Sequence, residues 1–521
     1  MTLKFSESPA VQIKEIDLTG TVPAVTSTTG AIVGDFNWGP VNTPVLVGNE
    51  SELAAVFGTP NMGDAYSGDF LSASYFLKYS SSLYVVRAGS DDQSEATLTP
   101  FTAKYPGELG NNILVSVAGG TEFSGWDYKS KFTSSPDDAK HEIHLIVVDS
   151  STTPHTVLEQ FEFLSVEQGA KLDNGSNNFV LDVINAQSSW VTVDTVDFDD
   201  GTGTGNIDSA PILGNFQLTG GESNGQLTQS EYTLGYDLFK NKEEVQIDFL
   251  IAPAGAQFNA PSIHKELNSI VLDRKDCVAV VSVKYQDLSN SSLSVGIGDY
   301  VSALSEDSSY LIVDGNHIKV YNKYEDKYEW IPAASSTAGV MAATDAVSAP
   351  WFSPAGSRRG QYVGVTEVLV NPSKTERDVM YKAGINPVIS SPGQGIMLFG
   401  DKTHLSRPSA FDRINVRRLF LVIERAISRA GENVMFEFND DFTRAEFVNI
   451  VEPFLREIQG RRGITDFRVV CDETNNTSEV VDRNEFIATC FIKPARSINY
   501  VTLNFVAVRT GVEFEEVVGT V

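Results

Sequence analysis

The sequence predicts an α+β protein built from several domains, and three observations support this class. The chain has 521 residues, 41% of them hydrophobic, whereas a single core rarely grows beyond about 250–300 residues. Strand-like and helix-like segments alternate over 21–98 and again over 221–345, which is the rhythm of βαβ units. The stretch between them, 99–220, is rich in Ser, Thr, Asp, Gly and Asn. We therefore predict a middle α/β domain that is interrupted by a β-rich insertion.

Both ends of the chain carry short alternating apolar patterns, which are typical of half-buried strands. We predict extended terminal arms at 1–20 and 506–521. A frayed terminus is the commoner fate of such segments, so that alternative stays open. The apolar residues of the two arms are Val11, Ile13, Ile16, Val512, Phe514 and Val517.

The middle domain is expected to begin with a buried strand in 28–36 and a short helix capped by Ser51. A helix over 70–80 and a strand over 81–89 follow. After the insertion, the pattern predicts helices at 232–245 and 262–275, strands at 246–255 and 277–285, and a hairpin with an aromatic face at 317–333. This alternation is the basis for assigning one α/β domain to both halves.

The insertion contains a segment, DFDDGTGTGNID at 197–208, that resembles a calcium loop. Gly201 stands where a third oxygen ligand should follow Asp197 and Asp199, so the segment fails the EF-hand pattern. A solvated turn is the better interpretation. Trp126 and Trp190 leave open an aromatic binding groove somewhere in the insertion.

The C-terminal domain, 346–505, contains the largest anomaly of charge. From Arg407 to Arg429 there are six arginines and two acidic residues, a net charge of +4 in a chain of net charge −29. The pattern predicts a helix over 411–430 that begins with a capping box of Ser409 and Asp412 and stops at Gly431.

At about 100° per residue, this helix separates an apolar face from a basic one. Leu419, Ile423 and Ile427 should be buried. The basic face should point outward and bind a partner through Arg413, Arg417, Arg425 and Arg429. For Arg418, which lies near the apolar boundary, the alternative is a contact inside the protein. A solvated face remains the competing interpretation of the whole stripe.

Further elements are expected beyond the arginine-rich helix. The pattern predicts a strand at 434–438 and a second helix at 442–459, kinked at Pro453 and ended by Gly460. Strands should follow near 467–471, 486–493 and 500–508.

Composition also excludes several classes of function. The acidic balance argues against nucleic-acid binding, which needs a broad basic surface. Three widely spaced cysteines indicate reduced thiols, and there is neither a secretory signal peptide nor an apolar run of the roughly 20 residues that cross a membrane. The six histidines form no HExxH pair, and Walker and GxSxG motifs are missing. The sequence therefore predicts a protein that is no enzyme and needs no cofactor or metal, and Gly393 and Gly395 are expected to form a tight turn.

Several motifs together resemble the contractile tail sheath family of bacteriophage tails and related injection machines. The segments GQGIMLFGDKTH and PSAFDRINVRRLF carry the most specific likeness, through Gly393, Gly395, Gly400, Thr403, Phe411, Ile414, Asn415, Val416, Arg417 and Arg418. DRNEFIATCFIKPARSINYVTLNF resembles the closing strands of the family, and TGAIVGDFNWGPVNTPVLVGNESELAAVFG its opening domain. YPGELGNN and LTGGESNG resemble the segments that bracket its inserted domain.

The resemblance implies a passive mechanical part of a virion tail, assembled in the host cytoplasm. Copies would stack as six-fold rings around a tail tube protein, with baseplate and tail terminator proteins as further partners. Contraction would then drive the tube through a cell envelope. By the same resemblance, 346–505 would be an inner sheath domain, 99–220 an outer one, and the arms would add strands to neighbouring subunits. The alternatives are a static tail or tube component and a receptor-binding tail protein.

Overall fold

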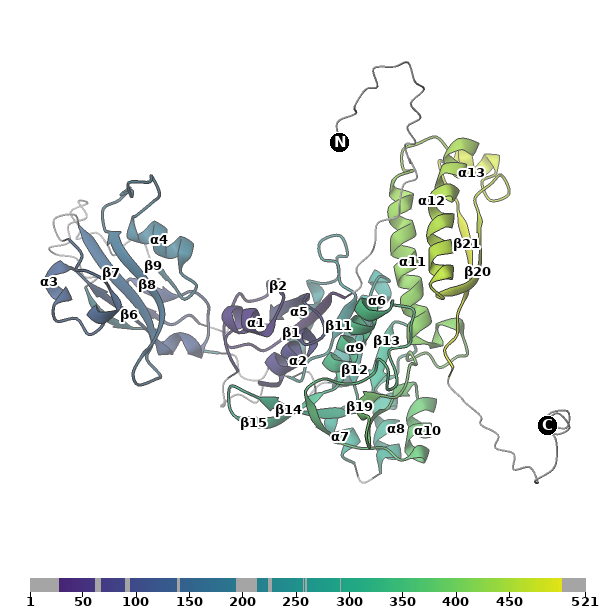
Figure 1. Ribbon diagram of the computed structural model, residues 1–521, viewed down its shortest axis with the longest axis horizontal. Coiled ribbons are helices and arrows are strands. Elements are labelled where there is room, and N and C mark those ends of the chain that lie inside the picture. The colour runs from purple at the N-terminus through teal and green to yellow at the C-terminus, as the bar shows by residue number, and fades with distance from the viewer. Residues whose placement is uncertain are drawn as a thin grey trace, which may run out of the picture. The chain divides into compact units, whose positions relative to one another are not determined.

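The computed structural model describes residues 28–498, apart from 61–66, 90–93, 138–140, 194–212, 224–226, 256, 258–259 and 291. Both predicted arms, with their six apolar residues, lie outside the described residues, as do the segment 197–208 and the strand expected at 500–508. The chain divides after Arg429 into two compact units. The protein has the mixed α/β architecture expected of it (Figure 1).

A seven-stranded sheet forms the centre of the larger unit. Six of its strands run parallel, and the edge strand β2 is antiparallel to β3. In spatial order the strands are β17 (Ile385–Asn386), β13 (Leu311–Asp314), β12 (Val278–Ser282), β11 (Phe249–Ile251), β1 (Gly30–Gly34), β3 (Leu83–Arg87) and β2 (Val45–Val47). The βαβ rhythm of the sequence is thus realised as a parallel sheet with its strands buried on both faces.

Helices cover both faces of this sheet, and the alternation of side chains along β1 shows why. Ala31 and Val33 belong to one buried cluster, whereas Ile32 between them belongs to another, as a period of two requires. One face carries α5 (Gln229–Asp237), α6 (Ala260–Arg274), α8 (Leu293–Leu304) and α10 (Lys374–Lys382). The other carries α1 (Glu50–Phe57), α2 (Ser67–Leu77) and α9 (Ala334–Val347).

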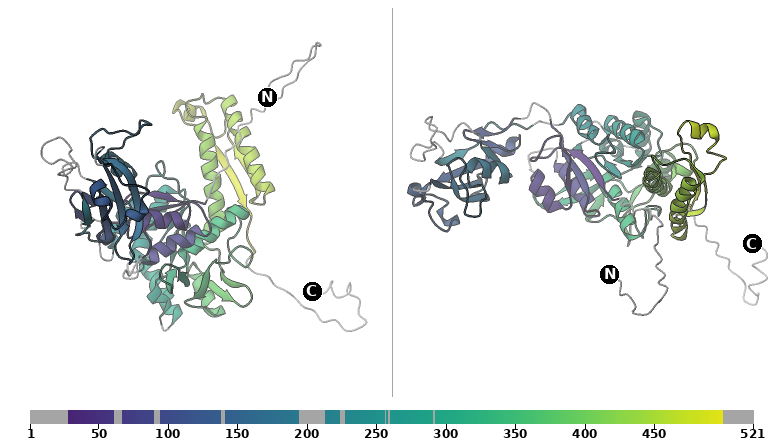
Figure 2. Two further views of the ribbon diagram at one scale, coloured as in Figure 1. Left: turned by 60° about the vertical axis from the view of Figure 1, so that its left-hand side comes forward. Right: turned by 90° about the horizontal axis from the view of Figure 1, so that it is seen from above.

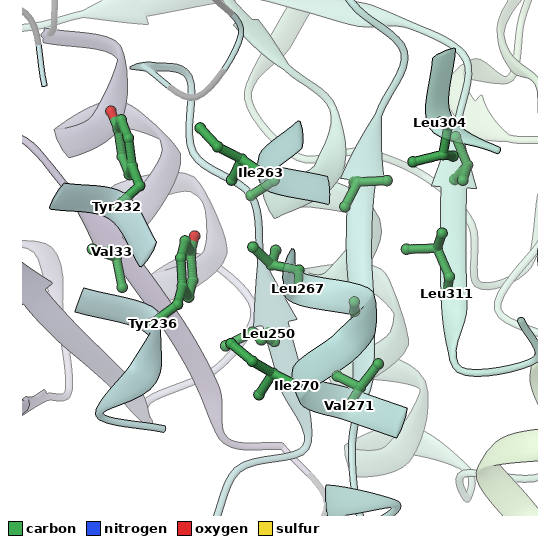
Figure 3. Packing of buried hydrophobic residues seen from close by; sticks show 14 of the residues in the cluster. Val33, Tyr232, Tyr236, Leu250, Ile263, Leu267, Ile270, Val271, Leu304 and Leu311 are labelled. Carbon is green, nitrogen blue, oxygen red and sulfur yellow. The ribbon is translucent and has the colours of Figure 1, made fainter. Parts of the chain in front are cut away.

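Figure 3 shows the first of these faces from close by. Tyr232 and Tyr236 of α5 and Leu267 of α6 point onto Val33 and Leu250 of the sheet. Each is almost completely buried, and replacing one such leucine by alanine costs about 2–5 kcal/mol. The short helix α7 (Tyr285–Leu288) adds Leu288 to the same cluster.

The cap of α1 differs from the expectation. Asn49, not Ser51, is the N-cap residue, and its side-chain oxygen accepts a hydrogen bond from the backbone N–H of Glu52 at 2.9 Å. The helix begins one residue before Ser51, so the serine lies inside its first turn. Asn and Ser are comparable caps, and the sequence alone does not choose between them.

Two smaller sheets lie beside the central sheet in sequence after the insertion. The predicted hairpin at 317–333 is confirmed as β14 (His317–Asn322) and β15 (Lys327–Pro332), joined by β16 (Val365–Val368). Its aromatic face is present, because Tyr321 and Tyr328 lie opposite each other with ring centroids 5.3 Å apart.

The tight turn expected at Gly393 and Gly395 is also confirmed. It joins β18 (Val388–Ser391) to β19 (Gly395–Leu398), and both glycines have φ near +80°. This left-handed region favours glycine over residues with a side chain.

The insertion is rich in strands, as its composition predicts, and has a core of its own. One sheet has the order β10 (Gly214–Gln217), β6 (Ile113–Ala118), β7 (Glu142–Asp149) and β8 (Thr156–Ser165); the other contains β4 (Thr97–Leu98), β5 (Phe101–Ala103) and β9 (Val191–Val193). Two helices, α3 (Gly120–Phe123) and α4 (Val180–Gln187), accompany them. Trp126 and Trp190 lie in different clusters, and Trp190 stacks on Trp38 at 5.1 Å.

The smaller unit contains α12 (Asp441–Gly460), β20 (Ile464–Val470), α13 (Ser478–Asp482) and β21 (Thr489–Pro494). The predicted second helix is confirmed with Pro453 inside it. Figures 1 and 2 show α12 lying along β20 and β21. The strand predicted at 434–438 is wrong: these residues form a turn between two helices, and Phe436 has a φ of 71°.

Candidate functional site

The arginine-rich helix α11 spans Ile414–Glu432, so it begins later than expected. Ser409 does cap a helical segment, but that segment is the separate 3₁₀ turn Ala410–Asp412, in which the Ser409 hydroxyl accepts the backbone N–H of Phe411 at 3.3 Å. The predicted capping box is therefore wrong. Arg413, with extended backbone angles, separates this turn from α11.

Leu419 and Ile423 are buried as predicted, whereas Ile427 is half-buried. Ile414 and Leu421 join the core cluster on the face of the central sheet that α1, α2 and α9 cover. The first turns of α11 are therefore part of the core of the larger unit.

Arg413 forms an ion pair inside the larger unit. Its Nη1 lies 2.9 Å from Asp401 Oδ1 and 2.5 Å from the hydroxyl of Tyr381. Asp401 is buried and also accepts a hydrogen bond from the Ser353 hydroxyl at 3.0 Å. Burial raises the pKa of Tyr381 to about 12, so this phenol remains a neutral hydrogen-bonding partner.

Arg417 is buried, with only 6% of its surface exposed. Its guanidinium lies 4.1 Å from the ring centroids of both Tyr310 and Phe411, and its Nη2 donates to the Ser309 hydroxyl at 2.6 Å. Burial lowers the pKa of Arg417. The expectation that this side chain points outward is wrong, because the flat guanidinium fills a slot between two aromatic rings.

Arg418 confirms the internal alternative. Nη1 lies 2.7 Å from Asp345 Oδ1, and Nη2 pairs with the other carboxylate oxygen. Nη1 also donates to the carbonyl of Met341 at 3.1 Å, and the guanidinium lies 4.8 Å from the ring centroid of Phe249. This bidentate pair joins α11 to the last turns of α9.

Arg425 reaches the start of the central sheet. Its Nη1 lies 2.7 Å from Asp248 Oδ1, and its Nη2 donates to the Asp276 carbonyl at 2.9 Å. Asp248 also accepts the backbone N–H of Thr29 at 3.0 Å. Burial raises the pKa of Asp248, and the nearby Arg425 opposes that rise.

The four predicted partner-binding arginines therefore differ in their access to a partner. Arg417 is buried, and the side chains of Arg413 and Arg425 are largely covered by ion pairs within the chain. Arg429 is half-exposed and makes a longer contact of 3.3 Å with Gln246 Oε1. The acidic partners were missed because Asp401, Asp345 and Asp248 lie 12, 73 and 177 positions from their arginines.

A second feature is the antiparallel ribbon of β20 and β21 in the smaller unit. Within the described residues, neither strand has a hydrogen-bonded neighbour on its outer edge. Phe447, Val451, Leu455 and Ile458 of α12 are buried, while many residues of the ribbon are exposed. Since two strands alone are marginally stable and an open edge accepts further strands, this ribbon is a candidate site of strand addition.

The three cysteines are free thiols. Cys471 is buried and Cys490 half-buried, so the expectation of two packed core residues holds fully only for Cys471. Among the residues that the structure describes, no group of three or more His, Cys, Asp or Glu is placed to hold a metal ion. Over the same residues, every helix is too short or too polar to traverse a lipid bilayer.

Three family models match the chain. They are the phage tail sheath protein central domain at residues 225–404, the phage tail sheath C-terminal domain at 406–507, and the N-terminal region of domain III of the tail sheath protein Gp18 at 27–88. The two larger matches together span the central sheet after the insertion, α11 and the C-terminal ribbon.

Curated relatives match over nearly the whole chain. The tail sheath protein of Salmonella phage ViI is 30% identical, and the match covers 99% of this chain and 98% of that protein. The tail sheath protein of Vibrio phage KVP40 is 28% identical with coverage of 98% and 99%. That of Enterobacteria phage T4 is 35% identical over 80% of this chain and 66% of its own length.

Solved structures agree on the fold. The sheath tail protein of Desulfitobacterium hafniense has a TM-score of 0.56 at 14% identity, with coverage of 94% of this chain and 100% of that one. The helical sheath of the anti-feeding prophage in its contracted state has a TM-score of 0.56 at 14% identity, with coverage of 96% and 99%. Taken together with the relatives at sequence level, these matches show that the chain belongs to the phage tail sheath protein family.

Proposed function

We propose that this chain is the repeating subunit of a contractile tail sheath, in which copies stack as six-fold rings around a tail tube. The observation that carries the proposal is similarity over nearly the full length to the tail sheath proteins of two phages, and over 80% of this chain to that of a third. Two structural neighbours, from the anti-feeding prophage and an extracellular contractile injection system, are described in a contracted state. Baseplate and tail terminator proteins would bind the two ends of the assembly, within a virion tail put together in the host cytoplasm.

Contraction of such an assembly needs no nucleotide. Each subunit gains a modest amount of interface free energy on passing from a trapped extended state to a contracted one. Identical gains then add along the polymer. The extended state persists because a kinetic barrier, rather than its equilibrium free energy, sets its lifetime.

The terminal arms are the proposed links between subunits. The ribbon of β20 and β21 has open edges within the described residues, and the chain continues beyond 498 and before 28 with apolar alternation at Val11, Ile13 and Ile16. Strands added from neighbours would hold through main-chain hydrogen bonds while arm stems permit rigid-body movement. Val512, Phe514 and Val517 have the same role at the other end.

Deletion of residues 1–18 tests this role. We expect a folded, soluble chain that forms no cylinders in negative-stain microscopy, whereas the full chain forms long striated ones. A substitution set refines the test: Val11→Ser, Ile13→Ser and Ile16→Ser should prevent assembly, while the matched set Gln12→Ser, Lys14→Ser and Glu15→Ser should not. Normal cylinders from the truncated chain would refute the role of the arm.

The basic stripe keeps a proposed role toward the tube chiefly at Arg429, because the other three arginines are held by partners inside the chain. A single exposed charge pair is worth about 0–1 kcal/mol. Repetition over many subunits makes such contacts sufficient to template assembly, and their weakness permits release. The insertion is proposed to be an outer domain that assembly does not require, since it has a separate core.

A further inference from the structure

The turn between α11 and α12 exposes four large apolar side chains within eight residues. Met435 is 58% exposed, Phe438 83% and Phe442 77%, while Phe436 is fully exposed. These four residues are termed the aromatic tip. Exposed apolar residues in such a concentration mark an interaction site in a soluble protein.

The backbone of the aromatic tip gives a second, independent sign. Phe436 has a φ of 71°, in the left-handed region that a bulky residue rarely adopts. Such a conformation is strained for a residue with a side chain. Asparagine or glycine would fit this position with less strain. The ring of Phe436 is exposed, so packing inside the protein does not explain why a strained phenylalanine stands here. A contact with another molecule would explain it.

The charge around the aromatic tip specifies the chemistry of its partner. Residues 432–446 contain five acidic residues and one arginine, a net charge of −4. The arginine, Arg444, is buried and pairs with Asp441 at 3.0 Å. The tip therefore presents aromatic rings surrounded by acidic groups, and its partner should present an apolar surface with basic groups around it.

Such a surface exists on the same unit, at the C-terminal end of α12 and along the ribbon that follows it, and is here termed the basic end. The segments 456–468 and 493–496 together contain six basic and two acidic residues, a net charge of +4. Phe491 is 59% exposed and Ile498 is 83% exposed. Phe491 lies directly opposite Arg468 in the ribbon, and Arg468 and Arg496 are both exposed.

The aromatic tip and most of the basic end lie far apart on one unit. Helix α12 runs from Asp441 to Gly460, about 30 Å at 1.5 Å per residue, and β20 then runs back along it, so Arg468 and Phe491 lie about 13 Å nearer the tip than Ile464 does. Charges of opposite sign at the two ends also suit the dipole of α12, but the dipole gives no reason for exposed rings at both ends. Two complementary patches far apart on one unit produce a heterologous contact that repeats from copy to copy.

We propose that the aromatic tip of one subunit docks on the basic end of the next, in a head-to-tail contact between the C-terminal units of neighbouring copies. The inference rests on the proposed sheath function and adds a contact that is separate from strand addition by the arms. The rings of Phe436 and Phe438 would pack on Phe491 and Ile498. Glu432 and Glu437 would face Arg468 and Arg496.

The test uses full-length chains with changes at one end. The tip variant is F436N/F438S, in which the new asparagine at position 436 tolerates the positive φ found there. The basic-end variant is R468E/R496E. Controls are V347S/V363S, which removes exposed apolar groups elsewhere, and R358E/R407E, which makes the same change in charge elsewhere. All should remain folded by circular dichroism. We expect tip and basic-end variants each to raise the critical concentration for cylinders about tenfold or more, and both controls to leave it unchanged.

A charge exchange then tests direct pairing. E432K/E437K alone should impair assembly, and its combination with R468E/R496E should restore it. Sedimentation velocity provides a readout without cylinders: the tip variant and the basic-end variant should each stay monomeric, whereas a mixture of the two should form a dimer through the single intact contact.

Three results would overturn the inference. One is assembly of both variants at the unmodified concentration, which would leave the sheath function intact. Another is failure of the tip variant alone while the basic-end variant assembles normally, which would assign the tip to the tube or to residues 1–27 of its own chain. The third is the absence of any dimer in the mixture. Absence of cylinders from the unmodified chain, with the dimer present in the mixture, would instead count against the sheath function.

Discussion

Replacing Arg418 tests whether α11 acts as an internal tie. Its guanidinium and the Asp345 carboxylate are both about 4% exposed and form a bidentate pair. Arg418→Met removes the cation and leaves the buried Asp345 carboxylate without its arginine. Breaking a buried pair in this way costs about 3–5 kcal/mol. Loss of the hydrogen bond to Met341 O and of the contact with the ring of Phe249 adds to that cost.

A double-mutant cycle separates the interaction free energy of the Arg418–Asp345 pair from the cost of lost packing. Asp345→Leu alone should cost a similar amount, because the buried Arg418 then lacks its carboxylate. The double variant Arg418→Met/Asp345→Leu should cost much less than the two single changes together, with a coupling of at least about 2 kcal/mol. A strongly favourable coupling is expected only where both groups lie in a dry environment.

The assay is urea unfolding of monomeric protein below its critical concentration, followed by tryptophan fluorescence. Since a chain with two units need not unfold in one step, hydrogen exchange of α9 and α11 should locate the effect. Exchange should accelerate in these helices and remain unchanged in the ribbon of the smaller unit. Single variants that cost less than about 1 kcal/mol, or costs that simply add, would refute the idea that α11 is fastened by this pair.

Two further predictions follow from buried polar groups. Arg417→Lys should destabilise the larger unit by about 1–2 kcal/mol, because an ammonium cannot stack between Tyr310 and Phe411 as the guanidinium does. The control Arg429→Lys should leave the urea midpoint unchanged. Equal midpoints for the two variants would contradict the packing described for Arg417. Burial raises the pKa of Asp314 to about 7, so the folded chain holds a proton there that the unfolded chain has lost above pH 4. The contribution of Asp314 to stability should therefore fall as pH rises from about 4 to 7, by at most about 4 kcal/mol. Asp314→Asn should make the dependence of stability on pH shallower over this same window, and an unchanged slope would disprove the prediction.

Local patterns were sufficient for most of the central sheet and its helices. The strands β1, β3, β11 and β12 lie within the segments predicted for them. A strand that is buried on both faces appears in the sequence as a short, continuous apolar run, which is too short for a typical helix. The hairpin at 317–333 was equally readable from alternation on either side of a polar turn. In these elements, local preference and tertiary environment favour the same conformation.

Where a tertiary partner decides the outcome, the pattern failed. The run VMFEF has the composition of a strand, but a strand needs a neighbour to receive its hydrogen bonds. Within the described part of the chain no strand pairs with this run, and the chain turns at Phe436 with a positive φ. The sequence shows the apolar residues at this place but gives no indication that they remain in solvent.

The arginine stripe is a failure of a different kind, and a more informative one. Helical periodicity separates an apolar from a basic face, but it says nothing about what packs there, so it missed that Arg417 is buried. Asp345 and Asp248 come from elements far away in the chain, and only the sheet topology brings them to α11. A subunit that moves as a rigid body during contraction must keep its internal contacts while its external ones change. Arginines bound to buried acids meet the first requirement, and for that reason the external contacts of this sheath protein should be sought at its exposed ends.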